Sequence, residues 1–118
     1  RILYTSTHYP ANYGFIPRTY GDDGDPLDVL LLCSEALEPL TLCRAYPIGA
    51  ISMIDNGRND EKIIAIPFTD PNYNRFFSVY KNLEGKETAV KEVIGKTEAI
   101  AIIEKAIDDY KQKFHIEG

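Results

Sequence analysis

The sequence has no surplus of positive charge and no long apolar run. Its 13 lysines and arginines are outnumbered by 18 aspartates and glutamates, which gives a net charge of −5. Because nucleic acids and anionic membranes are themselves negative, this balance disfavours nonspecific binding to either. No apolar run approaches the roughly 18 residues of a transmembrane helix. We therefore expect neither a nucleic acid nor a membrane as a partner.

Cysteine and histidine are also scarce. The two cysteines, Cys33 and Cys43, lie in apolar, strand-like segments. They could pair, but we expect buried, reduced thiols, which are typical of a cytoplasmic protein. We expect His8 and His115 to pack or to lie at the surface. With 44% apolar and 26% charged residues, the 118-residue chain has the composition of one globular domain.

Short apolar segments separated by turn residues predict about five strands. The longest segment contains Pro47 and Gly49, so we expect a bend or a bulge there. The stretch from Asp55 to Asp60 has the composition of a hairpin loop that leads into the next strand. The candidates for these strands are six strand-like segments, one more than the expected number, at residues 1–4, 12–17, 27–33, 41–53, 62–68 and 86–93.

Two helices are predicted beside these strands. From Thr97, a candidate N-cap, apolar residues recur as far as Phe114 with the 3.6-residue period of an amphipathic helix. Residues 75–81 resemble the end of a second amphipathic helix, too short to be stable alone. Together these elements predict an α+β fold, a small curved five-stranded OB-like β-barrel with flanking helices, including a C-terminal helix.

An acidic turn precedes the strand at residues 27–33. Four aspartates fall within seven residues of the stretch Gly21-Asp22-Asp23-Gly24-Asp25-Pro26-Leu27-Asp28. Carboxylates crowded so closely repel one another unless a cation joins them. Mg²⁺ and Mn²⁺ prefer such oxygen ligands, although a solvated acidic turn would have the same composition.

Two familiar acidic motifs do not fit this turn. An EF-hand would need a ligand at position 27 and a glutamate closing the loop, and the sequence supplies neither. A phosphatase motif of the Asp-x-Asp-x-Thr/Val type fails because Leu27 stands where a small β-branched residue is required. The remaining pattern is Asp-x-Asp-x-x-Asp at Asp23, Asp25 and Asp28.

A second acidic loop repeats this chemistry. Asp55 and Asp60 lie in a tight loop followed by Lys62, although aspartate is also an ordinary turn former. If both loops meet at one end of the barrel, their aspartates form an acidic cup. Such a cup could hold two or more cations about 4 Å apart, an arrangement that suits attack at phosphorus. The cations would also neutralise the carboxylates so that a phosphate substrate could approach. Candidates for gripping that substrate are Arg1, Lys62, Lys81, Tyr13 and Tyr80.

Four sequence blocks, in order along nearly the whole chain, resemble the family I soluble inorganic pyrophosphatases. The blocks are Tyr9-Pro10-x-Asn12-Tyr13-Gly14, Asp23-Gly24-Asp25-Pro26-Leu27-Asp28, Asp55-x-x-x-x-Asp60-x-Lys62 and Phe76-Phe77-x-x-Tyr80-Lys81. The Asp-Gly-Asp-Pro-x-Asp block is fairly specific by itself. The resemblance implies an inorganic diphosphatase that splits pyrophosphate into two orthophosphates, and a homo-oligomer, most often a hexamer among prokaryotic members.

The resemblance also implies a role for each matched residue. Asp25 matches the general base, Tyr13 an active-site tyrosine near the attacking water, and Tyr9 a tyrosine that supports the pocket. The implied ligands of several Mg²⁺ ions, with Mn²⁺ as an alternative ion, are Asp23, Asp28, Asp55 and Asp60. The implied substrate-binding residues are Arg1, Lys62, Tyr80 and Lys81.

The chain departs from the family pattern in two places. Residues 1–118 match a single inorganic pyrophosphatase domain, but family members have a segment before Arg1 and a longer stretch between Asn74 and Arg75. We expect both pieces to be missing from the sequence as given. Asn56 also stands where some members have a carboxylate, which places a peripheral metal contact in question.

Two other functions compete with hydrolysis. A calcium-binding module would use the acidic loops only to hold a structural ion, but it gives no reason for Lys62, Tyr80, Lys81 and Arg1 to accompany them. An OB-type oligonucleotide binder would need a basic groove with exposed aromatic residues, which the acidic charge opposes.

Overall fold

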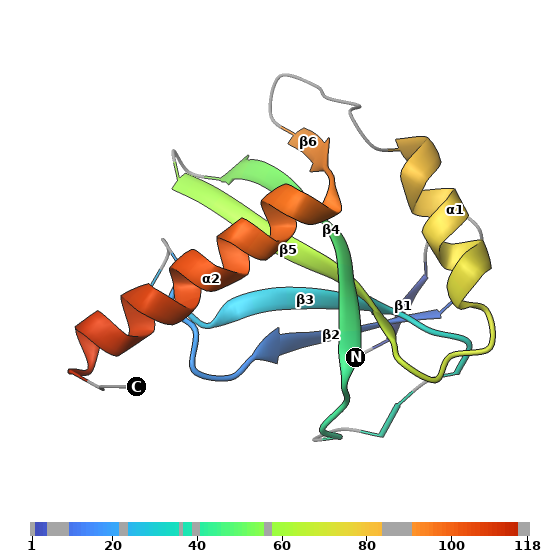
Figure 1. Ribbon diagram of the computed structural model, residues 1–118, viewed down its shortest axis with the longest axis horizontal. Helices are drawn as coiled ribbons and strands as arrows, with labels where there is room; N and C mark the ends of the chain where they lie inside the picture. Colours follow the sequence, from blue (N-terminus) through green and yellow to red (C-terminus); the bar gives the residue numbers. More distant parts are fainter. Residues whose placement is uncertain are drawn as a thin grey trace.

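The computed structural model describes residues 2–4, 10–21, 24–35, 37–38, 41–55, 58–83 and 91–115. In chain order these residues form β1 (Ile2–Tyr4), β2 (Pro10–Ile16), β3 (Leu27–Leu32), β4 (Ala45–Asp55), β5 (Arg58–Pro67), α1 (Tyr73–Leu83), β6 (Lys91–Ile94) and α2 (Lys96–Lys113). The strands make one curved sheet in the order β1-β2-β3-β5-β4-β6 (Figure 1).

The α+β class and the two flanking helices are confirmed, but the sheet differs from the expected five-stranded barrel. It has six strands among the described residues, because the short strands β1 and β6 both pair with a neighbour. These two strands form opposite edges, and no described pairing joins them. The sheet is therefore curved and open rather than closed.

The predicted irregularity in β4 is confirmed. Its pairing with β5 shifts register between Pro47 and Gly49. Proline cannot donate a backbone hydrogen bond to a sheet, so a strand that contains it favours a bulge. The hairpin between β4 and β5 is also present, with Asp55 paired to Arg58.

Strand pairing brings acidic and basic residues from distant parts of the chain together. β3 and β5 run parallel, and Asp28 is the register partner of Lys62. β2 pairs antiparallel with β3, with Tyr13 opposite Leu30. Because side chains alternate between the two faces of a strand, Tyr13, Asp28, Asp60 and Lys62 all share one face of the sheet.

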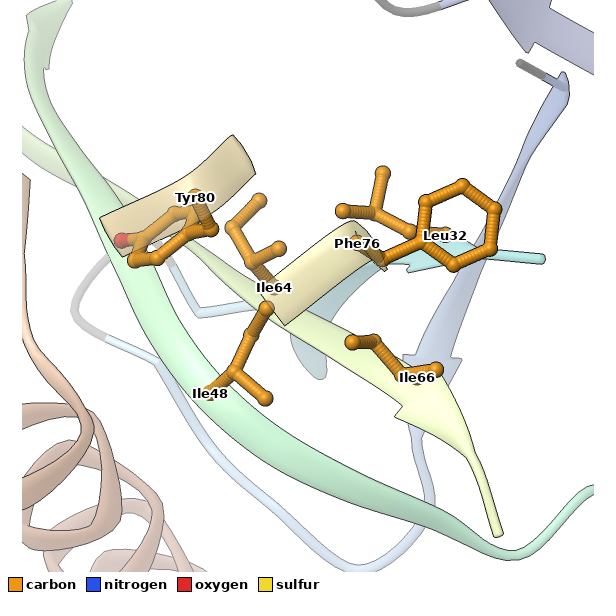
Figure 2. Close-up of a cluster of buried hydrophobic side chains, with 6 residues drawn as sticks. All are labelled: Leu32, Ile48, Ile64, Ile66, Phe76 and Tyr80. Carbon is orange, nitrogen blue, oxygen red and sulfur yellow. The ribbon is translucent and has the colours of Figure 1, made fainter. Parts of the chain in front are cut away.

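Helix α1 packs on that same face. Its residues Phe76 and Tyr80 point onto the sheet, where they contact Ile64 and the rest of one buried cluster (Figure 2). The buried members of this cluster are Leu32, Ile48, Ile64, Ile66, Phe76 and Tyr80. Helix α1 therefore covers the face that carries the candidate site residues.

Helix α2 packs on the opposite face, where its buried residues Ala99 and Ala106 meet Ile63 of β5.

Neither α1 nor α2 of the described chain combines the length and the apolar character needed to cross a bilayer. Two local predictions, one about α2 and one about a cysteine, are wrong. The N-cap of α2 is Gly95 rather than Thr97, which lies inside the first turn. Cys33 is buried as expected, but Cys43 is exposed, and both thiols are free.

We expect Gly49→Ala to destabilise the protein by about 1–3 kcal/mol, the usual cost of overpacking a core. A Cβ atom at Gly49 would overlap the ring of Tyr80. This ring cannot easily move away, because Tyr80 is 4% exposed and its hydroxyl contacts the carbonyl oxygens of Ala50 and Ile94. Urea denaturation measures the loss.

Gly14→Ala is the matched control for this substitution. A Cβ atom at Gly14 would lie 3.6 Å from Cγ1 of Val29, an ordinary van der Waals distance. We therefore expect a change of no more than about 0.5 kcal/mol, typical of substitutions that create no clash. Equal losses in the two variants would contradict the role assigned to the Gly49–Tyr80 contact.

Candidate functional site

The candidate site centres on the ammonium group of Lys62. The Nζ atom lies 3.5 Å from Oδ2 of Asp28 and 3.2 Å from Oδ2 of Asp60. The three side chains are between 22% and 27% exposed, so they are partly shielded but reachable from solvent. Burial by itself would lower the pKa of Lys62, but the hydrogen bond and charge of Asp60, the phenolate charge that Tyr13 carries once ionised, and the charge of Asp28 raise it. Lys62 is therefore positively charged at neutral pH.

Tyr13 completes this group from β2. The Lys62 Nζ lies 5.5 Å from the centre of the Tyr13 ring, close enough for a cation–π contact. Burial raises the pKa of Tyr13, and a hydrogen bond to Asp28 and the charge of Asp28 raise it further. The phenol therefore stays protonated at neutral pH and can donate a hydrogen bond.

The acidic turn that carries Asp25 is held by backbone bonds. The Gly21 amide donates to the Asp25 carbonyl oxygen at 2.8 Å, and the Gly24 amide donates to the Gly21 carbonyl oxygen at 3.0 Å. Gly24 has a φ of +86°, a conformation that glycine adopts without strain. At the neck of the turn, the hydroxyl of buried Thr19 contacts both flanking strands. No pattern in the sequence had pointed to Thr19.

Of the remaining predicted site residues, some are described by the structure and others are not. Asp25 is exposed on its turn, and Lys81 is exposed on α1. Arg1, Tyr9 and Asp23 lie outside the described residues. So does the side chain of Asp55, although its backbone ends β4.

Tyr80 is buried between α1 and the sheet rather than exposed. Its hydroxyl lies 2.8 Å from the carbonyl oxygen of Ala50 and also contacts that of Ile94. Figure 2 shows the Tyr80 oxygen directed toward β4. Phosphate binding by this hydroxyl would have to replace these backbone contacts, and the role remains a prediction.

Of the aspartates expected to form the acidic cup, the structure brings Asp28 and Asp60 together. Within the described residues, no three acidic, histidine or cysteine side chains gather closely enough to hold a metal ion. Nevertheless, the carboxylates of Asp28 and Asp60 converge on one positive charge, the Lys62 ammonium. Two converging carboxylates are the oxygen donors that a hard divalent cation prefers. The residues present therefore fit a divalent metal.

An apolar hollow of about 580 Å³ lies largely on the α2 face of the sheet; of the charged group it shares Tyr13 but not Asp28, Asp60 or Lys62. Its lining includes Val29, Leu31, Ile63 and Ala65, with Ile103 of α2 at one side. Phosphoryl chemistry needs charged groups aimed at the phosphorus oxygens. We therefore place the candidate site at Lys62 and not in this hollow.

The raised pKa of Tyr13 gives a direct spectroscopic test of the site. We expect Asp28→Asn to lower the pKa of Tyr13 toward the ordinary value of 10.0, because a hydrogen-bonded negative charge is removed. Lys62→Met should raise it further, because Lys62 now lowers it. A pH titration of phenolate absorbance, with Tyr13→Phe to identify the signal, measures both shifts.

The raised pKa of Tyr13 also determines how its contribution to folding stability changes with pH. Because the folded-state pKa is raised, the contribution of Tyr13 to stability is present below pH 10 and is lost as pH rises through the folded-state pKa. The loss should be smaller in Tyr13→Phe. Shifts of the same sign in Asp28→Asn and Lys62→Met would contradict the described contacts.

Comparison with known proteins supplies further findings. A family profile described as inorganic pyrophosphatase matches residues 1–111. The chain is 40% identical over 131 residues to soluble inorganic pyrophosphatase 2 of Chlamydomonas reinhardtii, covering 97% of this chain and 68% of that protein. It is 44% identical over 127 residues to the soluble inorganic pyrophosphatase of Oryza sativa subsp. indica, covering 93% of this chain and 59% of that protein. The chain thus spans about two thirds or less of the length of these relatives.

A solved structure agrees with these sequence matches. The inorganic pyrophosphatase of Helicobacter pylori aligns with a TM-score of 0.66 and 37% identity, over 94% of this chain and 77% of that chain. The likeness therefore covers nearly the whole chain.

Proposed function

Because the chain belongs to the inorganic pyrophosphatase family, we propose that it hydrolyses pyrophosphate to two orthophosphates with the help of divalent metal ions. One observation of the structure carries this proposal. Asp28 and Asp60 converge on the Lys62 ammonium, so two proposed metal ligands and a proposed phosphate-binding cation lie side by side. A structural calcium module would have no use for that cation.

The metal in this proposal is Mg²⁺, with Mn²⁺ as an alternative ion. Bound metal would supply a water of lowered pKa and would offset the charge of the substrate. Its ligands would be Asp23, Asp28, Asp55 and Asp60. In the described part of this set, the Lys62 ammonium lies where the Asp28 and Asp60 carboxylates converge.

The chain's own residues would move the proton and hold the phosphates. Asp25 would accept a proton from the attacking water, whose oxygen then bonds to phosphorus as the bridging P–O bond breaks. Lys62 would offset the negative charge that develops on the leaving phosphate. Tyr13, kept protonated by its raised pKa, would hold the Asp28 carboxylate in place. The other proposed substrate-binding residues are Arg1, Tyr80 and Lys81.

We extend the proposal to the rest of the family resemblance. The match to the algal protein spans 131 positions, more than the 118 residues of this chain. This supports a stretch within the matched region that relatives have and this chain lacks, which we place between Asn74 and Arg75. We also propose that the protein is cytoplasmic and forms a homo-oligomer, with a hexamer favoured.

Orthophosphate release from pyrophosphate tests the proposed function. We expect release with Mg²⁺, loss of all release with excess EDTA, and recovery when Mg²⁺ is restored, because the carboxylates need a cation to admit the anion. A chain that binds Ca²⁺ and becomes more stable with it, but releases no orthophosphate with Mg²⁺, would instead be a calcium-binding module.

A further inference from the structure

We propose that Thr19 is a positioning residue for the metal-binding turn, and that its hydroxyl sets the affinity of this turn for Mg²⁺. The inference rests on the proposed function, because it assumes that Asp25 and Asp28 act on a metal-bound substrate. Thr19 itself touches neither substrate nor metal. It would act through the backbone that carries the two aspartates.

The contacts of Thr19 close the neck of the turn. Its hydroxyl donates to the Ile16 carbonyl oxygen at 2.6 Å and accepts a hydrogen bond from the Leu27 amide at 2.9 Å. Ile16 and Leu27 are the last register pair between β2 and β3. One side chain thus joins the two ends of the turn that lies between these strands.

Burial makes this hydroxyl costly to remove. Thr19 is 3% exposed and Leu27 is 5% exposed, so water cannot readily replace the hydroxyl. A valine at this position has nearly the same shape but cannot accept a hydrogen bond. The Leu27 amide would then lose its acceptor inside the protein, which is unfavourable. The chain can relieve that cost only by moving Leu27, the residue directly before Asp28.

A second contact fixes the outer side of the turn. The Tyr20 amide donates to the carbonyl oxygen of Ala106 in α2 at 3.0 Å. The Tyr20 ring also lies edge-on to Phe114, with 6.4 Å between the ring centres. The turn is therefore held at two points, by Thr19 at its neck and by α2 behind it. With these ends fixed, the backbone that leads into Asp28 would need less ordering when a cation binds.

Thermal unfolding at increasing Mg²⁺ concentration tests this role without relying on catalysis. A ligand that binds only the folded protein raises its unfolding temperature. We expect Thr19→Val to need at least about tenfold more Mg²⁺ for the half-maximal rise, in keeping with the cost of an unpaired buried amide. Thr19→Ser keeps the hydroxyl and should stay within about threefold of the wild type by the same reasoning.

Thr41→Val is the matched control. The Thr41 hydroxyl also donates to a carbonyl three residues earlier, that of Glu38, but on an exposed turn. We expect its Mg²⁺ requirement to equal that of the wild type. A Thr19→Val protein that unfolds at a lower temperature without metal, yet needs the same Mg²⁺ concentration, would give Thr19 a purely structural role and overturn the proposal.

If Thr19→Val does not fold, amide hydrogen exchange in the wild type replaces it. We expect Mg²⁺ to slow exchange of the Leu27 amide, which bonds to Thr19, and to leave the Thr41 amide unchanged. Unchanged exchange at Leu27 would overturn the proposal. A wild type that Mg²⁺ stabilises but that releases no orthophosphate would refute the proposed function and leave the Thr19 comparison intact. Orthophosphate release without any Mg²⁺-dependent rise in the unfolding temperature would overturn the proposal for Thr19 and leave the proposed hydrolysis intact.

Discussion

Replacing Asp25 with asparagine is expected to lower the turnover of pyrophosphate by about 10²–10⁴-fold, the usual effect of losing a general base. Asparagine has almost the same size, but its amide cannot accept a proton from the attacking water. The turn should survive the change, because its bond to Gly21 uses the carbonyl oxygen of residue 25 and not the side chain. Orthophosphate release at saturating Mg²⁺ measures the effect.

Asp108→Asn provides the control for loss of one negative charge. Asp108 is exposed on α2, on the other side of the sheet from Lys62. We expect turnover to stay at the wild-type level in this variant. Asp25→Asn should also keep its Mg²⁺-dependent rise in unfolding temperature, since Asp25 is proposed as base and not as ligand. Full turnover in Asp25→Asn would remove this residue from the mechanism.

Local sequence signals predicted most of the elements correctly. The bend in β4 followed from proline, and the hairpin after it followed from a run of aspartate, asparagine and glycine. The order of strands could not be predicted in the same way. The parallel pairing of β3 with β5 depends on residues 34 positions apart, and local propensity carries no information about such distant partners. Whether the sheet closes depends on the same long-range pairing.

The same difference between local signals and long-range pairing applies to the candidate site residues. The spacing of the aspartates suggested a cation site, and the resemblance to a family supplied each role. Neither indicated that Asp28 and Asp60 would share the Lys62 ammonium, since this follows from the β3–β5 register. Thr19 was missed because a single threonine between Arg18 and Tyr20 has no distinctive spacing. Its importance is visible only when Ile16 and Leu27 lie side by side.

Replacing Lys62 with methionine is expected to lower turnover by about 10²–10³-fold, the typical loss when one group that stabilises developing charge is removed. Methionine keeps the length of the side chain and removes its charge. Without Mg²⁺, Asp28 and Asp60 would then lose the Lys62 charge on which they now converge. We therefore expect Mg²⁺ to raise the unfolding temperature more in Lys62→Met than in the wild type.

Lys105→Met separates this effect from the loss of any surface ion pair. Lys105 lies 2.6 Å from Asp109 one turn away on α2, but this lysine is 67% exposed. Exposed pairs of this kind contribute roughly 0.3–0.5 kcal/mol, so we expect no change in turnover or in the response to Mg²⁺. Opposite changes in Lys62→Met, with lower turnover but greater stabilisation by metal, would follow only if Lys62 both binds phosphate and neutralises the metal ligands. An equal response to Mg²⁺ in Lys62→Met and the wild type would contradict the second of these roles.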